Sequence, residues 1–120
     1  MGQWEGRFHR EIAMNEPALF TAVCRDPVQY RPNGGESLAA LTQRVATVYD
    51  RLVTTYPNQH LFIIAHAVVI RGIIGHVLQA HPNRWYRLRI DYASMTRICH
   101  DEFGPRVQYI NTTPLQTLTA

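Results

Sequence analysis

The residue best placed for chemistry is a histidine between an apolar run and an apolar helical pattern. His66 directly follows Leu61–Ala65, and the helical pattern Val68–Leu78 begins two positions later. At the carboxyl end of a buried strand, such a side chain lies where open α/β sheets bind ligands. Unpaired amides at a helix N-terminus attract anions, and an imidazole there can stabilise charge or carry a proton. The pattern indicates an anion site at His66, and the equally open alternative is that this residue only caps the helix or forms a hydrogen bond inside the core.

A glycine-rich loop is the second candidate. Gly34 and Gly35 precede Glu36 and the start of a long helical pattern. Paired glycines allow backbone torsions that other residues resist. We expect Gly35 and Glu36 to lie beside the anion site, with an ordinary loop and helix cap as the alternative. Arg71, one helical turn beyond His66, is expected to reach an anion or to pair with a carboxylate.

The remaining histidines and the cysteines show no spacing typical of metal ligands or redox motifs; they are His9, His60, His76, His81, His100, Cys24 and Cys99. We therefore expect no metal and no cofactor. Free thiols without a pairing pattern favour a cytoplasmic protein.

Composition narrows the class of protein further. The chain has 120 residues, a size that predicts a single domain over residues 1–120. The apolar runs are much shorter than the ~20 residues of a membrane span. The net charge is +3 and all basic residues are arginine. Arginines and aromatic residues alternate within 84–97, yet no nucleic-acid motif accompanies them, so nucleic-acid binding is not expected.

Helical and extended patterns alternate along the chain. Helices are expected from an Asn15 cap to Asp26, over residues 37–56 and over Val68–Leu78. The long helix has its apolar face at Leu38, Leu41, Val45, Val48 and Leu52. Strands are expected at Leu61–Ala65, Met95–His100 and Arg106–Asn111, with the turn between the last two at Phe103–Pro105.

This order predicts an α/β fold, a partial three-layer sandwich with a mostly parallel sheet flanked by helices. The run Leu61–Ala65 does not alternate, which is typical of a strand buried on both faces of a parallel sheet. The two late strands form a hairpin and are antiparallel to each other. The predicted sheet is therefore short of strands on its N-terminal side.

Several segments together resemble a known family. In sequence order they are Met1–Gly6, Gly34–Leu38 with Arg44 and Val45, Leu61–Arg71, Trp85–Asp91 with Ala93–Thr96, and Tyr109–Asn111. They look like the C-terminal part of the histidine phosphatase superfamily, in the branch of cofactor-dependent phosphoglycerate mutase and alpha-ribazole phosphatase.

The resemblance implies phosphoryl transfer through a phosphohistidine, with phosphomonoesters as substrates. In this family a histidine of an R-H-G motif attacks the phosphate, and an acidic residue protonates the leaving group. A second histidine stabilises the transferred group, and His66 is its match. The amide of Ala67 would be a phosphate contact.

The chain departs from the family pattern, since it contains no R-H-G motif and Ala67 and Val68 replace the usual glycines. We therefore expect a truncated chain that is inactive alone, and its status as an enzyme is left open. The alternative is a non-catalytic module for oligomerisation or for a split enzyme. The expected partners are a phosphorylated small molecule, a second copy, or a complementing N-terminal chain.

Overall fold

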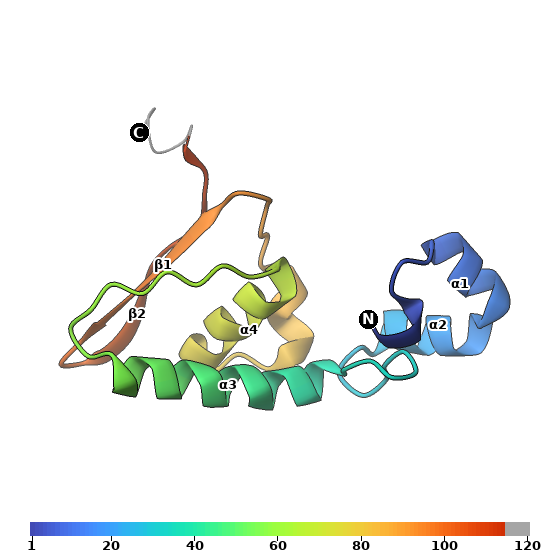
Figure 1. The fold of residues 1–120 in the computed structure, drawn as a ribbon, viewed down its shortest axis with the longest axis horizontal. Coiled ribbons are helices and arrows are strands. Elements are labelled where there is room, and N and C mark those ends of the chain that lie inside the picture. Colours follow the sequence, from blue (N-terminus) through green and yellow to red (C-terminus); the bar gives the residue numbers. More distant parts are fainter. Residues whose placement is uncertain (115–120) are drawn as a thin grey trace. The chain divides into compact units, whose positions relative to one another are not determined.

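The computed structural model describes residues 1–114 (Figure 1). The chain divides into two compact units, Met1–Arg44 and Val45–Ala120, which are described separately below. The single domain expected over residues 1–120 stays a prediction.

Unit 1 is built from short helices around a small core. It contains η1 (Gly2–Trp4), α1 (His9–Asn15), α2 (Pro17–Arg25) and the start of α3 (Leu38–Thr55). The predicted Asn15 cap is wrong: α1 ends at Asn15, and Glu16 is the N-cap of α2. Pro17 fits there because the first helical residue has no amide partner to lose. The helix ends before Asp26, whose non-helical backbone (φ −141°, ψ 75°) agrees with the exclusion of the helical region before Pro27.

The core of unit 1 forms around Trp4 and Ile12, both buried. The Trp4 indole lies 5.9 Å from the ring of Phe20, and its Nε1 donates to Glu16 Oε2 at 2.9 Å. Arg7 also donates to Glu16, at 3.2 Å. A polar atom of the buried indole is thereby satisfied, which makes burial of the large ring favourable.

The long helix α3 was predicted correctly in its extent, since it covers Leu38–Thr55. Its buried residues are Leu38, Leu41, Val45 and Tyr49. The expected contribution of Val48 to this face is wrong, because Val48 is exposed and Tyr49 takes its place. Both residues fit a spacing of three or four, so the helical period alone does not separate them.

Unit 2 is organised around α4 (Ala67–Leu78) and η2 (Pro82–Arg87), which pack against each other. Ile74 and Trp85 are completely or almost completely buried. Gly75 makes this packing possible: a Cβ at its position would lie 2.1 Å from Trp85 Nε1. The helix ends at Leu78, and the left-handed backbone of the C-cap residue Gln79 lets Ala80 N–H donate to Gly75 O at 2.8 Å.

The described residues of unit 2 form one sheet, the antiparallel pair β1 (Met95–Asp101) and β2 (Gly104–Thr112). Both late strands are thus confirmed, although the turn is at Glu102 and Phe103, one residue before the predicted one. The Asp101 carboxylate accepts the Phe103 N–H at 2.8 Å, and Gly104 follows with a φ of +104°. The prediction of a mostly parallel sheet is wrong for the described residues.

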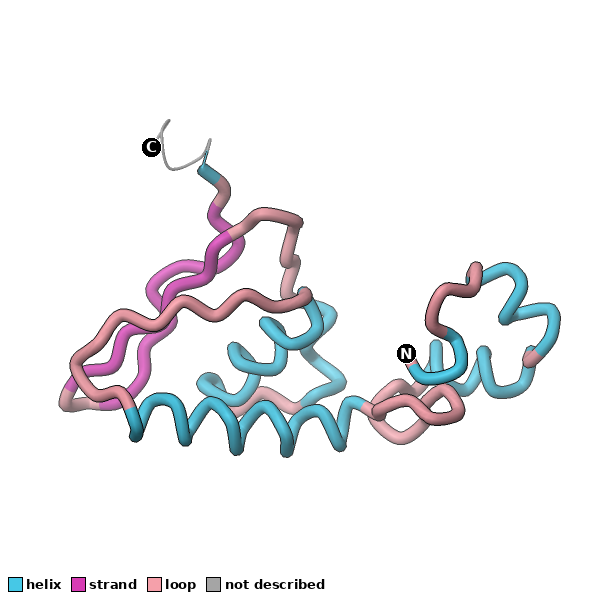
Figure 2. The backbone as a smooth tube through the Cα atoms, in the orientation of Figure 1, coloured by secondary structure: helices cyan, strands magenta, loops and turns pink. Residues whose placement is uncertain are grey.

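The segment Leu61–Ala65 is the largest departure from expectation. It is a loop between α3 and α4 (Figure 2), not a buried strand. None of its backbone groups has a backbone hydrogen bond among the described residues. Phe62 is 90% exposed and Ile64 is 100% exposed. A strand exists only with a partner, and no described segment pairs with this one.

Candidate functional site

His66 lies at the N-cap of α4, as the sequence pattern predicted. Its backbone is extended, and its carbonyl accepts the amides of Val69 and Ile70 at 3.0 and 3.1 Å. The imidazole makes no capping hydrogen bond and is exposed. It has no hydrogen bond or ion pair among the described residues, which leaves it available to a ligand.

The first turn of α4 supplies a second element of the site. The amides of Ala67 and Val68 have no backbone acceptor among the described residues. Unpaired amides and the positive end of the helix dipole favour an anion at this position. An imidazole beside them can donate to the same anion. The contact of phosphate with the Ala67 amide stays a prediction.

Gly35 and Glu36 belong to unit 1, whereas His66 and Ala67 belong to unit 2. The place of the loop beside His66 therefore stays a prediction. Within unit 1, the guanidinium of Arg44 donates two hydrogen bonds of 2.8 Å each to the carboxylate of Glu36. These bonds from Arg44 hold the pKa of the Glu36 carboxyl below its usual value. Glu36 is thus an ionised residue that fastens its loop to α3.

Arg71 pairs with no carboxylate among residues 1–114, so that alternative is wrong, whereas its reach to an anion stays a prediction. Its Nε donates to the carbonyl of Leu88 at 2.8 Å. Its guanidinium lies over the ring of Tyr86, 5.3 Å from the centroid. Arg71 therefore ties α4 to the end of η2.

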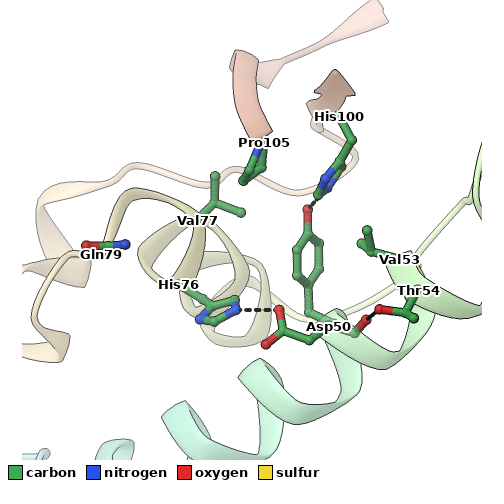
Figure 3. Close-up of a pocket in the computed structure, with 9 residues that line it drawn as sticks. Asp50, Val53, Thr54, His76, Val77, Gln79, His100 and Pro105 are labelled. Atoms are coloured by element: carbon green, nitrogen blue, oxygen red, sulfur yellow. Dashed lines mark hydrogen bonds and ion pairs between the residues drawn. The ribbon is translucent and has the colours of Figure 1, made fainter. Parts of the chain in front are cut away.

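A pocket of about 360 Å³ lies in unit 2 between α3, α4 and the hairpin (Figure 3). His76 Nε2 lies 2.8 Å from Asp50 Oδ1, and Tyr49 Oη lies 2.5 Å from His100 Nε2. Sequence reasoning missed this cluster, since no local motif marks partners so far apart in the chain. Both imidazoles already have protein partners, so the cluster links three elements of unit 2.

Burial and the neighbouring Asp50 carboxylate raise the pKa of Tyr49 to about 12. We expect this phenol to ionise near pH 12, and Tyr49→Phe to remove that step from a titration of absorbance. The folded chain favours the neutral phenol. The contribution of Tyr49 to the free energy of unfolding is therefore fully present below pH 10.0 and is lost as the pH rises towards 12. Tyr92→Phe is the control, since Tyr92 is fully exposed. An unchanged titration of Tyr49→Phe would contradict the assignment.

Over residues 1–114, no group of His, Cys, Asp or Glu side chains is arranged to hold a metal ion. No described helix is long and apolar enough to span a membrane.

Comparison with known families places this site in context. Residues 1–113 match the model of the histidine phosphatase superfamily (branch 1), and the chain belongs to this superfamily. The resemblance inferred from the sequence segments is thereby confirmed.

Similar proteins have phosphatase names. The adenosylcobalamin/alpha-ribazole phosphatase of Escherichia coli is 26% identical over 97 residues, or 81% of this chain and 48% of the relative. Phosphoserine phosphatase 1 of Hydrogenobacter thermophilus is 25% identical over 112 residues, or 93% and 53%. The crystal structure of alpha-ribazole phosphatase from Shigella flexneri superimposes with a TM-score of 0.83 at 24% identity, covering 92% of this chain and 55% of that one. This chain spans about half the length of these proteins, and the structural match supports the α/β fold of the family.

Proposed function

We propose that the chain binds the phosphoryl group of a phosphorylated small molecule through His66 and Ala67, as part of a phosphomonoester phosphatase. The observation that carries this proposal is the exposed imidazole of His66 at the N-terminus of α4, which has no hydrogen-bond partner among residues 1–114. Membership of the superfamily supports the class of reaction. The substrates named for its relatives differ, so the substrate class proposed here is the phosphomonoester alone.

We further propose that these residues do not turn over substrate by themselves. Transfer through a phosphohistidine needs a nucleophile within reach of the phosphorus. The sequence contains no R-H-G motif, and no imidazole or carboxylate is in hydrogen-bond contact with His66 among the described residues. The nucleophile and the acid would have to come from outside residues 1–120.

The test is the binding of inorganic phosphate, followed by calorimetry or by phosphorus NMR. His66→Ala should weaken binding about tenfold or more, because a charge-assisted hydrogen bond is lost. His9→Ala is the matched control, since His9 is also exposed but lies in α1. Equal affinities of the wild type and His66→Ala would overturn the assignment of the site.

A second measurement addresses turnover. The chain alone should release no phosphate from p-nitrophenyl phosphate above the rate of the buffer. Turnover that is abolished by His66→Ala would confirm the site and contradict the proposal of an incomplete catalyst.

A second candidate function is a module that associates with another chain without catalysis. The specific observation in its favour is the exposure of Phe62 and Ile64, two large apolar side chains in a segment that pairs with no other part of residues 1–114.

A further inference from the structure

We propose that the loop Leu88–Ser94 forms the wall of the phosphoryl site against which the organic part of the substrate lies, and that Asn111 is the positioning residue of this loop. The inference rests on the proposed function, because it concerns the site at His66 and Ala67. It adds to that site a contact for the group that is esterified to the phosphate.

The start of the loop lies beside the first turn of α4. Arg71 Nε donates to the carbonyl of Leu88 at 2.8 Å. Side chains of a helix lean towards its N-terminus, so the side chain of Arg71 covers the turn that begins at Ala67. Ala67 precedes Arg71 by four residues, or about 6 Å along the helix axis. The chain accordingly passes the N-terminal end of α4 on its way from η2 to β1 (Figure 1).

The middle of the loop is fastened to the end of β2 by two hydrogen bonds between Asp91 and Asn111. The backbone amide of Asp91 donates to Asn111 Oδ1 at 2.7 Å, and Asn111 Nδ2 donates to Asp91 Oδ2 at 3.1 Å. Within the loop, Arg89 Nε donates to Asp91 Oδ1 at 3.0 Å, and Ser94 Oγ donates to the Asp91 carbonyl at 2.8 Å. The hydrogen bonds of the loop therefore meet at Asp91, and Asn111 links this residue to β2.

A β-bulge at the end of β2 turns Asn111 towards the loop. Next to Thr96 the pairing is irregular, and two residues of β2, Ile110 and Asn111, stand against one of β1. Asn111 has a φ of +58°, and its amide donates to Thr96 Oγ1 at 3.4 Å. Asparagine tolerates this left-handed region better than most residues. Bulges of this kind re-aim side chains next to functional sites, and here the bulge directs the Asn111 amide group to Asp91.

The loop keeps a backbone conformation that its sequence does not favour. Ala93 has a φ of +55°, in the left-handed region that alanine rarely adopts because its Cβ approaches the following carbonyl oxygen. Such residues persist only where their surroundings hold them, and they cluster at sites that contact ligands. The hydrogen bonds of Asp91 and Ser94, before and after Ala93, hold it in this conformation. We therefore expect the loop to present a fixed surface beside the first turn of α4.

The carboxyl group of Asp91 anchors the loop and does not act as the missing acid. Hydrogen bonds from Arg89 and from Asn111 lower its pKa below the usual value, so the group is ionised at neutral pH and has no proton for a leaving group. The guanidinium of Arg89, at 3.0 Å, balances the charge of this carboxylate. The loop therefore does not repel an anion that is bound at the first turn of α4.

Asn111→Gly tests the positioning role, in the full chain and with two ligands. Glycine adopts a positive φ readily, so the bulge is kept while both side-chain hydrogen bonds to Asp91 are lost. We expect the variant to bind phenylphosphonate, a phosphoryl group with an organic substituent, about fivefold more weakly than the wild type, because those bonds order the loop. Its affinity for inorganic phosphate should stay within about twofold, since the variant leaves the hydrogen bond of His66 to the anion unchanged. Calorimetry measures both affinities.

Asn58→Gly is the matched control. Asn58 also has a positive φ, of 57°, and its side chain makes no hydrogen bond among residues 1–114. The control should keep the affinity of the wild type for both ligands. If Asn111→Gly loses equal affinity for both ligands, or loses none for either, the proposal is overturned.

A measurement on the wild type does not depend on how a variant folds. In proton–nitrogen NMR spectra, phenylphosphonate should shift the amide signals of Leu88–Ser94 as well as those of Ala67 and Val68. Inorganic phosphate should shift the signals of Ala67 and Val68 and leave the loop signals in place. Loop signals that do not respond to phenylphosphonate would contradict the proposed wall.

A double variant tests whether Asn111 acts through Asp91. Asp91→Ala should weaken the binding of phenylphosphonate about as much as Asn111→Gly does. Because the two residues form one contact, the double variant should lose no more affinity than either single variant. Additive losses would show that Asn111 does not position the loop through Asp91.

The failures of this inference and of the proposed function are distinguishable. If phosphate binding needs His66 but Asn111→Gly does not separate the two ligands, the phosphoryl site stands and the wall is wrong. If His66→Ala leaves phosphate affinity unchanged while Asn111→Gly separates the two ligands, the assignment of His66 fails and the loop contact stands. A chain that binds neither ligand would overturn both.

Discussion

Gly75→Ala should destabilise unit 2, although the same change in most helices stabilises them. The added Cβ would lie 2.1 Å from Trp85 Nε1 and 2.8 Å from Cε2. The indole is 1% exposed and rigid, so it cannot move aside without displacing its surroundings. Overpacking of this kind costs about 1–3 kcal/mol, which exceeds the ~0.5–1 kcal/mol that alanine gains over glycine in a helix.

Urea denaturation followed by circular dichroism at helical wavelengths measures this loss. Leu78→Ala in the same helix is the control, because Leu78 is half exposed and its substitution should cost less. The fluorescence of Gly75→Ala should also shift to longer wavelength as the indole of Trp85 gains solvent. An increase in stability would show that Trp85 does not pack against Gly75.

Trp4→Ala should unfold unit 1, because the indole is the centre of its small core. Truncating a buried tryptophan costs about 3–5 kcal/mol, and few other side chains here are buried. The change also removes the 2.9 Å hydrogen bond from the indole to Glu16 and leaves that carboxylate with Arg7 alone. Amide hydrogen exchange across α1 and α2 should become fast, which mass spectrometry of peptic peptides can measure.

Trp4→Phe separates the two contributions of this residue. It keeps an aromatic ring near Phe20 but loses the donor to Glu16. We expect an intermediate loss of about 1–3 kcal/mol, the range for a hydrogen bond to a charged group. Equal exchange rates in Trp4→Ala and Trp4→Phe would mean that the hydrogen bond, and not packing, holds unit 1 together.

Local patterns predicted the helices and the hairpin well. Helical periodicity gave α3 and α4 nearly to their ends, and α2 began only two residues after its expected cap. These features depend on neighbours within one or two turns, which a sequence displays directly. Where two neighbours fit the period equally, as Val48 and Tyr49 do, only the packed structure decides.

The sheet was predicted less well, for a physical reason. The composition of Leu61–Ala65 indicates a segment suited to burial between helices, but composition does not provide the strands on either side. Pairing is a property of two segments, and the described residues contain a partner for β1 but none for this run.

In the candidate site, too, local features could be predicted from the sequence and long-range contacts could not. His66 was found from its place between an apolar run and a helix, and the structure puts it at the N-cap of α4. The contact of Tyr49 with His100 joins residues 51 positions apart, and that of Asp50 with His76 spans 26. Such contacts arise from the packing of whole helices and strands, and no short sequence motif predicts them.

The open segment between α3 and α4 also bears on how long the chain survives in a cell. Proteases bind their substrates as extended, unpaired backbone. The backbone of helices and sheets is already hydrogen-bonded and is not available for this binding. Phe62 presents an aromatic side chain in that form, and cleavage there would divide unit 2 between its two long helices. Cleavage at this segment does not require local unfolding. Its rate therefore follows the fraction of chains in which the segment is exposed to the protease. Covering this segment would therefore slow cleavage at this point of the chain.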